Sequence, residues 1–283
     1  MQKSFDVSGP LTLALRVPIG EIAIDATLEG RAEVELIAHD EESQALVDAS
    51  TIDLRGNELI VDVPQKNRTG FNFAFLFGRG GITCRVRCPA GSNAEVRSKS
   101  ADLVARGTLG NVSVNTASGD TALQIVAGNL NVKSASGDVG AESIGGDATV
   151  QTASGDVALG QVGGIVSVNA VSGDVRVEQA MGDTVVHTVS GDQRHESVGS
   201  GNVTSHSVSG DVLIAVRRGS RVYLDCNTIS GDTSSELDMT GEPATDGPLI
   251  ELRVKTVSGD ITITRAPEAS GPPPADSAQE VHA

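Results

Sequence analysis

The sequence predicts an all-β protein, a β-solenoid (β-helix or β-roll) of about nine 18-residue coils preceded by a small β-rich capping region. Three observations lead to this prediction. The tripeptide Ser-Gly-Asp recurs at a step of 18 residues, apolar and polar residues alternate between its copies, and no helical period occurs between residues 100 and 265. One such coil cannot bury its inward face alone, so the coils must stack.

The composition excludes several functions. The net charge is 21 − 37 = −16, which argues against nucleic-acid binding, because phosphate neutralisation needs a basic face. Aromatic residues make up only 2% of the chain, which removes the usual stacking platforms for bases and sugars.

Residues 1–95 carry strand-like alternation without the repeat, and we expect them to form a small sheet that caps the first coil. The expected strands lie at 11–17, 21–26, 32–38, 58–63 and 82–88. The three cysteines, Cys84, Cys88 and Cys226, are too few for a disulfide framework. Cys84 and Cys88 are also about 13 Å apart along a strand, too far to form a disulfide or share one metal ion. We expect all three to be small fillers of a β core.

A phenylalanine segment interrupts this region. Four phenylalanines alternate there, so that they share one face of an extended strand: Phe71, Phe73, Phe75 and Phe77. One interpretation is a strand that closes the end of the core. The alternative is an exposed interaction patch for a protein partner, for self-association or, less favoured, for a membrane surface. The flanking basic residues, which keep the membrane version open, are Lys66, Arg68 and Arg79.

The repeat occupies residues 96–265. Its five regular copies start at Ser118, Ser136, Ser154, Ser172 and Ser190, later ones at Ser209, Ser230 and Ser258, and a degenerate one at Ser100. Alignment predicts two inward ladders, one of Val114, Val132, Val150, Val168 and Val186, the other of Leu123, Ala141, Leu159 and Val177. It also predicts an outward polar column of Asn115, Lys133, Gln151, Asn169, His187, His206, Asn227 and Lys255. The longer later steps predict loops near residues 217–220 and 239–248.

The aspartates of the repeat form a predicted acidic column, whose regular members are Asp120, Asp138, Asp156, Asp174 and Asp192. Neighbouring carboxylates about 4.8 Å apart repel each other, so something must offset the repulsion at every coil. The favoured explanation is structural, with each aspartate accepting a hydrogen bond from the backbone N–H two residues on. The alternative is a cation between the coils, for which calcium is the candidate cofactor.

The ends of the chain complete the prediction. Residues 266–283, with Pro267 and the run 272–274, have no apolar period and are expected to be a disordered tail. The sequence shows no secretory signal and no run of about 18 apolar residues, which predicts a cytoplasmic location.

The residues resemble a bacterial family of unknown function known as β-strand-repeat "putative adhesins". The resemblance rests on Phe5-Asp6-Val7, Val17-Pro18-Ile19-Gly20, Pro89-Ala90-Gly91-Ser92 and the repeat unit of residues 152–157. It covers about residues 1 to 265 and implies a β-solenoid with no known catalytic residue and no established ligand.

The predicted function is therefore a non-catalytic scaffold or interaction protein that binds an unidentified protein partner or itself. One alternative is a carbohydrate-binding or carbohydrate-active β-helix, for which Glu142, Glu178 and Glu196 share an outward column but lack a basic or aromatic platform. The other is a self-assembling β-helical filament, which needs uncapped ends. The sequence contains none of the GxSxG, HExxH, CxxC or P-loop motifs, so no catalytic or metal-binding residue is assigned.

Overall fold

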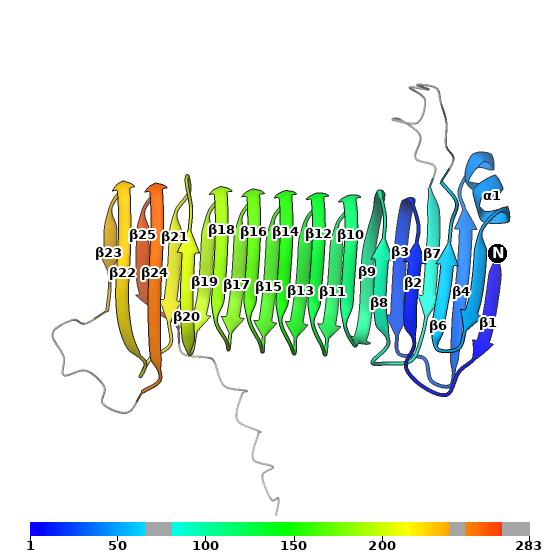
Figure 1. The fold of residues 1–283 in the computed structure, drawn as a ribbon, viewed down its shortest axis with the longest axis horizontal. Helices are drawn as coiled ribbons and strands as arrows, with labels where there is room; N and C mark the ends of the chain where they lie inside the picture. The colour runs from blue at the N-terminus through cyan, green and yellow to red at the C-terminus, as the bar shows by residue number, and fades with distance from the viewer. Residues whose placement is uncertain (66–80, 238–246, 268–283) are drawn as a thin grey trace, which may run out of the picture.

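The computed structural model describes residues 1–65, 81–237 and 247–267, and nearly all of their secondary structure is β-strand. Within these residues thirteen strands form one sheet, sheet A, and twelve form another, sheet B. The two sheets face each other across the buried core, and both run along the length of a rod (Figure 1). The prediction of an all-β chain is confirmed, and the long parallel runs of strands in both sheets are consistent with the predicted β-solenoid.

Each central coil contributes one strand to each sheet, joined by a Ser-Gly-Asp turn. The sheet B strands are β8 (Asn93–Arg97), β10 (Val112–Ser118), β12 (Leu130–Ser136), β14 (Ala148–Ser154), β16 (Val166–Ser172), β18 (Thr184–Ser190) and β20 (Gly201–His206). The sheet A strands are β9 (Ser100–Leu109), β11 (Thr121–Val126), β13 (Val139–Ile144), β15 (Val157–Val162), β17 (Val175–Ala180), β19 (Gln193–Val198) and β21 (Val212–Val216). Neighbours pair in parallel with an offset of one repeat, as Val132 pairs with Val150.

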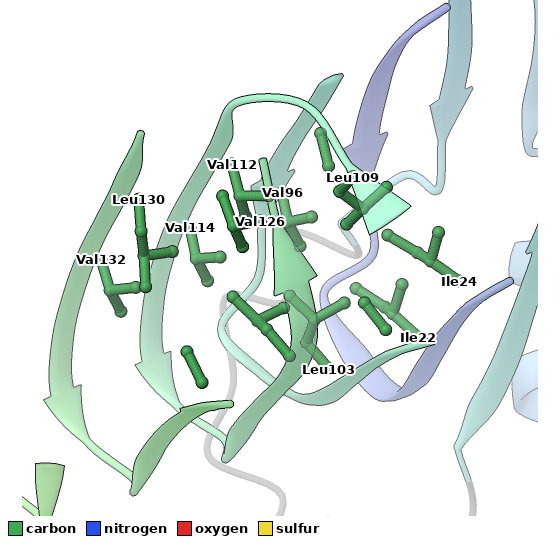
Figure 2. Packing of buried hydrophobic residues seen from close by; sticks show 14 of the residues in the cluster. Ile22, Ile24, Val96, Leu103, Leu109, Val112, Val114, Val126, Leu130 and Val132 are labelled. Carbon is green, nitrogen blue, oxygen red and sulfur yellow. The ribbon is translucent and has the colours of Figure 1, made fainter. Parts of the chain in front are cut away.

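The core lies between the sheets and consists of ladders of equivalent side chains. Both predicted inward ladders are buried, and Val132, Val150 and Val168 are fully inaccessible to solvent. Figure 2 shows Val112, Val114, Leu130 and Val132 directed into this interior from neighbouring coils. Because every coil covers the inward face of the next, the packing of one coil depends on its two neighbours.

The N-terminal region extends the same two sheets. In sheet B, β2 (Thr12–Arg16) pairs in parallel with β8 on one side and with β6 (Glu58–Asp62) on the other. In sheet A, β3 (Ile19–Ala26) pairs in parallel with β9 on one side and with β7 (Ile82–Arg87) on the other. The outermost strands are antiparallel instead, namely β4 (Arg31–Ala38), β1 (Gln2–Asp6) and β5 (Thr51–Arg55). The direction of the strands therefore changes at this end of the rod.

One short helix, α1 (Glu41–Asp48), packs against β4 and was not predicted. Asp40 caps it by accepting a hydrogen bond from the backbone N–H of Ser43 at 2.6 Å, and this bond is the main cause that lowers the pKa of Asp40. Glu41 and Glu42 lie in the first turn, where the helix dipole favours acidic side chains. This capping pattern was the available signal in the sequence.

The C-terminal coils do not stack in the order of the chain, and here the sequential interpretation of the repeat was wrong. Strands β24 (Leu249–Ser258) and β25 (Ile261–Arg265) pair with β20 and β21, whereas β22 (Arg221–Ser230) and β23 (Thr233–Ser235) pair on their far side. The coil of β24 and β25, which is last in the sequence, thus lies in space between the coil of β20 and β21 and the coil of β22 and β23. The spatial order of the late repeats is Ser209, Ser258, Ser230.

The structure locates two of the cysteines but not the phenylalanine patch. Cys84 and Cys88 are buried in the core, where loss of solvation raises the pKa of their thiols to about 12 and about 11. The phenylalanine patch, Phe71 to Phe77, lies outside the described residues. Among the residues that the structure describes, no helix is long and apolar enough to cross a membrane.

Candidate functional site

The aspartate column forms a hydrogen-bonded ladder along one corner of the rod. The backbone N–H of Asp156 donates to Oδ1 of Asp138 at 2.8 Å, and that of Asp174 donates to Oδ1 of Asp156 at 2.8 Å. The same bond links all nine aspartates from Asp102 to Asp232, including the reordered pairs Asp211–Asp260 and Asp260–Asp232. The predicted partner, an N–H two residues on, was wrong: the donor belongs to the equivalent aspartate of the next coil.

A second ladder at the half-repeat turns, where no pattern was predicted, uses the same geometry. The backbone N–H of Asn129 donates to Oδ1 of Asn111 at 2.9 Å, and that of Asp147 donates to Oδ1 of Asn129 at 2.9 Å. Asparagine and aspartate serve equally here, because each provides one carbonyl-type oxygen as acceptor. No group of three or more His, Cys, Asp or Glu side chains within the described ranges could hold a metal ion.

This equivalence gives a stability prediction. We expect Asp156→Ala to lower the free energy of unfolding by about 1 kcal/mol, because the N–H of Asp174 loses its acceptor. We expect Asp156→Asn to retain the stability, because it keeps the acceptor and removes a like charge. Urea unfolding with and without a chelator tests both variants. A free energy of unfolding that falls with chelator and returns with calcium would show instead that the column holds cations.

The outer face of sheet A has a shallow groove with a volume of about 520 Å³. Small residues floor it, including Ala122, Gly140 and Ala158. Glu142 and Glu178 line it, and the carboxylates of Glu178 and Glu196 share one cation, the guanidinium of Arg176, with N–O distances of 3.6 and 2.9 Å. Of the three glutamates in the column, Glu178 and Glu196 thus pair with arginine on an open face, and they do not converge on a closed cleft.

The outer face of sheet B has a second groove, of about 640 Å³, which we call the sheet B groove. One wall is the predicted polar column, with Asn115, Lys133, Gln151, Asn169 and His187 in register. The other wall is an apolar column that was not predicted, formed by the residue before each repeat serine: Ala135, Ala153, Val171 and Val189. The residues between the walls are Thr116, Ser134, Thr152, Ala170 and Thr188, and the side chains of the three threonines and of Ala170 are buried.

The apolar column is exposed. Val171 and Val189 keep 52% and 49% of their surface in contact with solvent, and the equivalent Val208 and Val257 keep 49% and 45%. Single exposed valines are ordinary, but a column of them in adjacent coils forms a continuous apolar ridge. The signal was present in the sequence as a valine that recurs directly before the serine of the repeat.

The polar column is free of acidic residues over most of its length. From Arg97 it continues through the groove to His187, His206 and Lys255, and it contains no Asp or Glu between these ends. The imidazoles of His187 and His206 lie with their centroids 5.1 Å apart. Partial burial lowers the pKa of His206, with smaller contributions from His187 and Lys255. In a chain of net charge −16 this column thus carries basic and amide side chains and no carboxylate.

A polar layer, also missed from the sequence, crosses the interior beneath this face. Nε2 of Gln193 donates to Oγ1 of Thr188 at 2.8 Å and to the carbonyl of His206 at 2.9 Å, and its Oε1 accepts from the hydroxyl of Ser205. His195 lies in the same coil, fully buried, with neither ring nitrogen hydrogen-bonded. Loss of solvation lowers its pKa to about 4. This layer separates the two apolar clusters of the core, and its burial denies a substrate access.

Comparisons with known proteins place most of the chain in one family. A family model described as Toastrack DUF4097 matches residues 21–264. No curated protein matches the sequence.

Similar solved structures come from species of Parabacteroides, Bacteroides and Clostridium. A "putative adhesin" from Parabacteroides merdae is 12% identical, with 94% of this chain and 96% of that chain covered and a TM-score of 0.39. A "putative lipid binding protein" from Parabacteroides distasonis is also 12% identical, with the same coverages and a TM-score of 0.47. A "putative cell adhesion protein" from Clostridium sporogenes is 12% identical over 94% and 99% of the two chains, with a TM-score of 0.29.

Proposed function

The chain belongs to the Toastrack DUF4097 family, and from that premise we propose that it is a non-catalytic, adhesin-like binding protein whose contact surface is the sheet B groove. The observation that carries the proposal is the groove's pair of unlike walls, one cationic and amide-bearing and one aliphatic. A surface of parallel ladders suits a partner that lies extended along several coils.

The groove's chemistry favours a protein partner. No aromatic residue lines it, which disfavours sugar rings as its main occupants, because these usually stack on aromatic faces. Its aliphatic ridge suits the side chains of Leu, Ile or Val, and Lys133 with His187 suits carboxylates. We therefore infer an extended polypeptide segment with acidic and aliphatic side chains as the partner.

The architecture proposed for this function is a rod with one closed end. About nine Ser-Gly-Asp coils, residues 96–265, provide the surface, and residues 1–95 act as the N-terminal cap. The antiparallel strands β1, β4 and β5 with helix α1 support this role, because a reversed strand and a covering helix block further parallel stacking. Residues 266–283 remain a proposed tail.

Selection from a displayed peptide library tests the binding proposal. We expect the selected peptides to be rich in Asp, Glu and aliphatic residues, and their affinity to fall with rising salt. Lys133→Glu and Val189→Asp should each weaken binding of a selected peptide about tenfold or more, measured by fluorescence polarisation, because each places a negative charge in the groove.

The control is Arg194→Glu, which makes the same two-unit change of charge as Lys133→Glu but on the outer face of sheet A, and it should leave the affinity unchanged. Peptides that bind all three variants equally well would place the contact surface elsewhere. Selective binding of neutral glycans, with no peptide selected, would favour the carbohydrate-binding alternative.

A further inference from the structure

The two ends of the rod differ in a way that bears on self-association. At the N-terminal end the outermost strands are antiparallel and α1 packs against β4. At the other end the outermost strand of sheet B is β22, which pairs with β24 in parallel and has no partner on its outer side among the described residues. Figure 1 shows β22 at this end, beyond β24. An unpaired edge of ten residues is a ready template for another strand.

The outer edge of β22 offers a defined set of backbone groups. The N–H of Arg221 points toward the β24 side of the strand, where it donates to the carbonyl of Pro248 at 3.0 Å. Because successive residues of a strand direct their backbone N–H and C=O groups to opposite edges, the N–H and C=O groups of Val222, Leu224 and Cys226 point away from β24, toward the free edge of the sheet. These three residues also direct half-buried side chains toward the open end of the core. A partner strand would therefore satisfy the free backbone groups and cover apolar surface together.

The charges on β22 distinguish the ways in which two copies of this strand could pair antiparallel. A two-fold axis at Asp225 would place Asp225 against the partner's Asp225, which is repulsive. An axis at Leu224 would place uncharged residues of the partner strand opposite both Arg221 and Asp225, although Asp225 also lies in register with Arg253 of its own protomer. An axis at Tyr223 places Arg221 opposite the partner's Asp225, twice by symmetry. Pairing of opposite charges across strands is stabilising and pairing of like charges is not.

We propose that two copies of the chain associate end to end through β22, in an antiparallel pair centred on Tyr223. Arg221 is held at the start of the strand, since its Nε donates to the carbonyl of Gly247 at 3.1 Å. Tyr223 is 58% exposed and would face its symmetry mate. Association stops at two copies, because a two-fold contact uses the same surface of both copies and leaves none of it free. The N-terminal end of the rod, whose outermost strands are antiparallel, offers no edge equivalent to β22. A dimer and not a filament follows.

Charge exchange tests the register. The wild type should sediment as a dimer of twice 28.9 kDa at high concentration and dissociate on dilution. Arg221→Asp and Asp225→Arg should each raise the dissociation constant about tenfold or more, because each turns two attractive contacts into repulsive ones. The double variant, Arg221→Asp with Asp225→Arg, should restore dimerisation. The control Arg194→Asp, on the outer face of sheet A, should have no effect.

A cross-link provides a second measurement that does not depend on the charge variants folding well. Residues opposite each other in a non-hydrogen-bonded antiparallel pair have Cα atoms about 4.5 Å apart, within the range of a disulfide. Tyr223→Cys in a Cys226→Ser background should therefore give a disulfide dimer on mild oxidation. Ile229→Cys in the same background should not, because its symmetry mate is distant. A wild type that stays monomeric at every concentration, or a dimer that neither charge variant weakens, overturns the proposal.

Discussion

Gly155→Ala is expected to lower the free energy of unfolding by about 3 kcal/mol or more, one of the largest effects of a single methyl group in this chain. Gly155 lies in a central Ser-Gly-Asp turn with φ of 128°, a conformation that side chains rarely adopt. A Cβ atom there would also collide with the carbonyl oxygen of Gly137 in the neighbouring coil. Because the Gly137 carbonyl belongs to the backbone of the neighbouring coil, the collision can be relieved only by moving the two coils apart.

A second glycine separates these two causes. Gly30 also has a positive φ, 73°, but no atom lies within 4 Å of the position where its Cβ would be. Gly30→Ala should therefore cost only the conformational strain, about 1–2 kcal/mol. Urea unfolding of the two variants gives the difference. Equal losses would show that the Ser-Gly-Asp turns are not in close contact and that the glycine serves conformation alone.

The repeat predicts which residues face the core but not the order in which the coils stack. Strict periodicity places Val132, Val150 and Val168 in one buried ladder. The same periodicity makes the coils interchangeable, because any Ser-Gly-Asp unit can bond to any other through its aspartate. The inserted position of β24 and β25 therefore depends on the lengths of the connecting loops, which the repeat does not encode. The steps of 21 and 28 residues were consequently interpreted as insertions between sequential neighbours.

In the candidate sites, too, the repeat predicted some residues and missed others. The polar wall of the sheet B groove was predicted, because a column of Asn, Lys and Gln at one repeat position is plainly outward. Its apolar wall was missed, because the alanines of the first coils conceal the valines that replace them from Val171 onward. His195 was missed although it continues a predicted inward ladder exactly one repeat after Val177. A histidine breaks the apolar pattern, so periodicity alone gives no reason to place it in the core.

His195 is expected to make folding strongly dependent on pH. Burial lowers its pKa from 6.5 to about 4 in the folded protein, whereas the unfolded chain keeps the ordinary value. Below pH 6.5 the unfolded state therefore binds a proton that the folded state does not, and stability falls with falling pH. The loss is about 1.4 kcal/mol for each pH unit, or about 3 kcal/mol in total by pH 4, and this histidine contributes no further change below that.

His195→Leu should remove this dependence and stabilise the protein at neutral pH. Both ring nitrogens are buried without a hydrogen bond, and replacing them with an apolar side chain of similar size removes an unsatisfied polar group, a gain of about 1–3 kcal/mol at pH 7. The ladder neighbours of His195, Val177 and Ile214, are already aliphatic, so the leucine meets apolar contacts on both sides. The advantage of the variant should then grow by about 2–3 kcal/mol between pH 7 and pH 4.5, measured by urea unfolding.

The comparison between variants isolates His195 from the acidic residues that titrate in the same range. Carboxylates common to both proteins contribute equally to both curves, so the difference in free energy of unfolding cancels them. Asn169→Gln provides the matched control, because Asn169 is exposed in the polar column and the change replaces no titrating group, so the pH dependence should stay as in the wild type. If the difference between wild type and His195→Leu were constant across pH 4.5–7, the imidazole would have to reach solvent or a partner, and the polar layer could not be sealed.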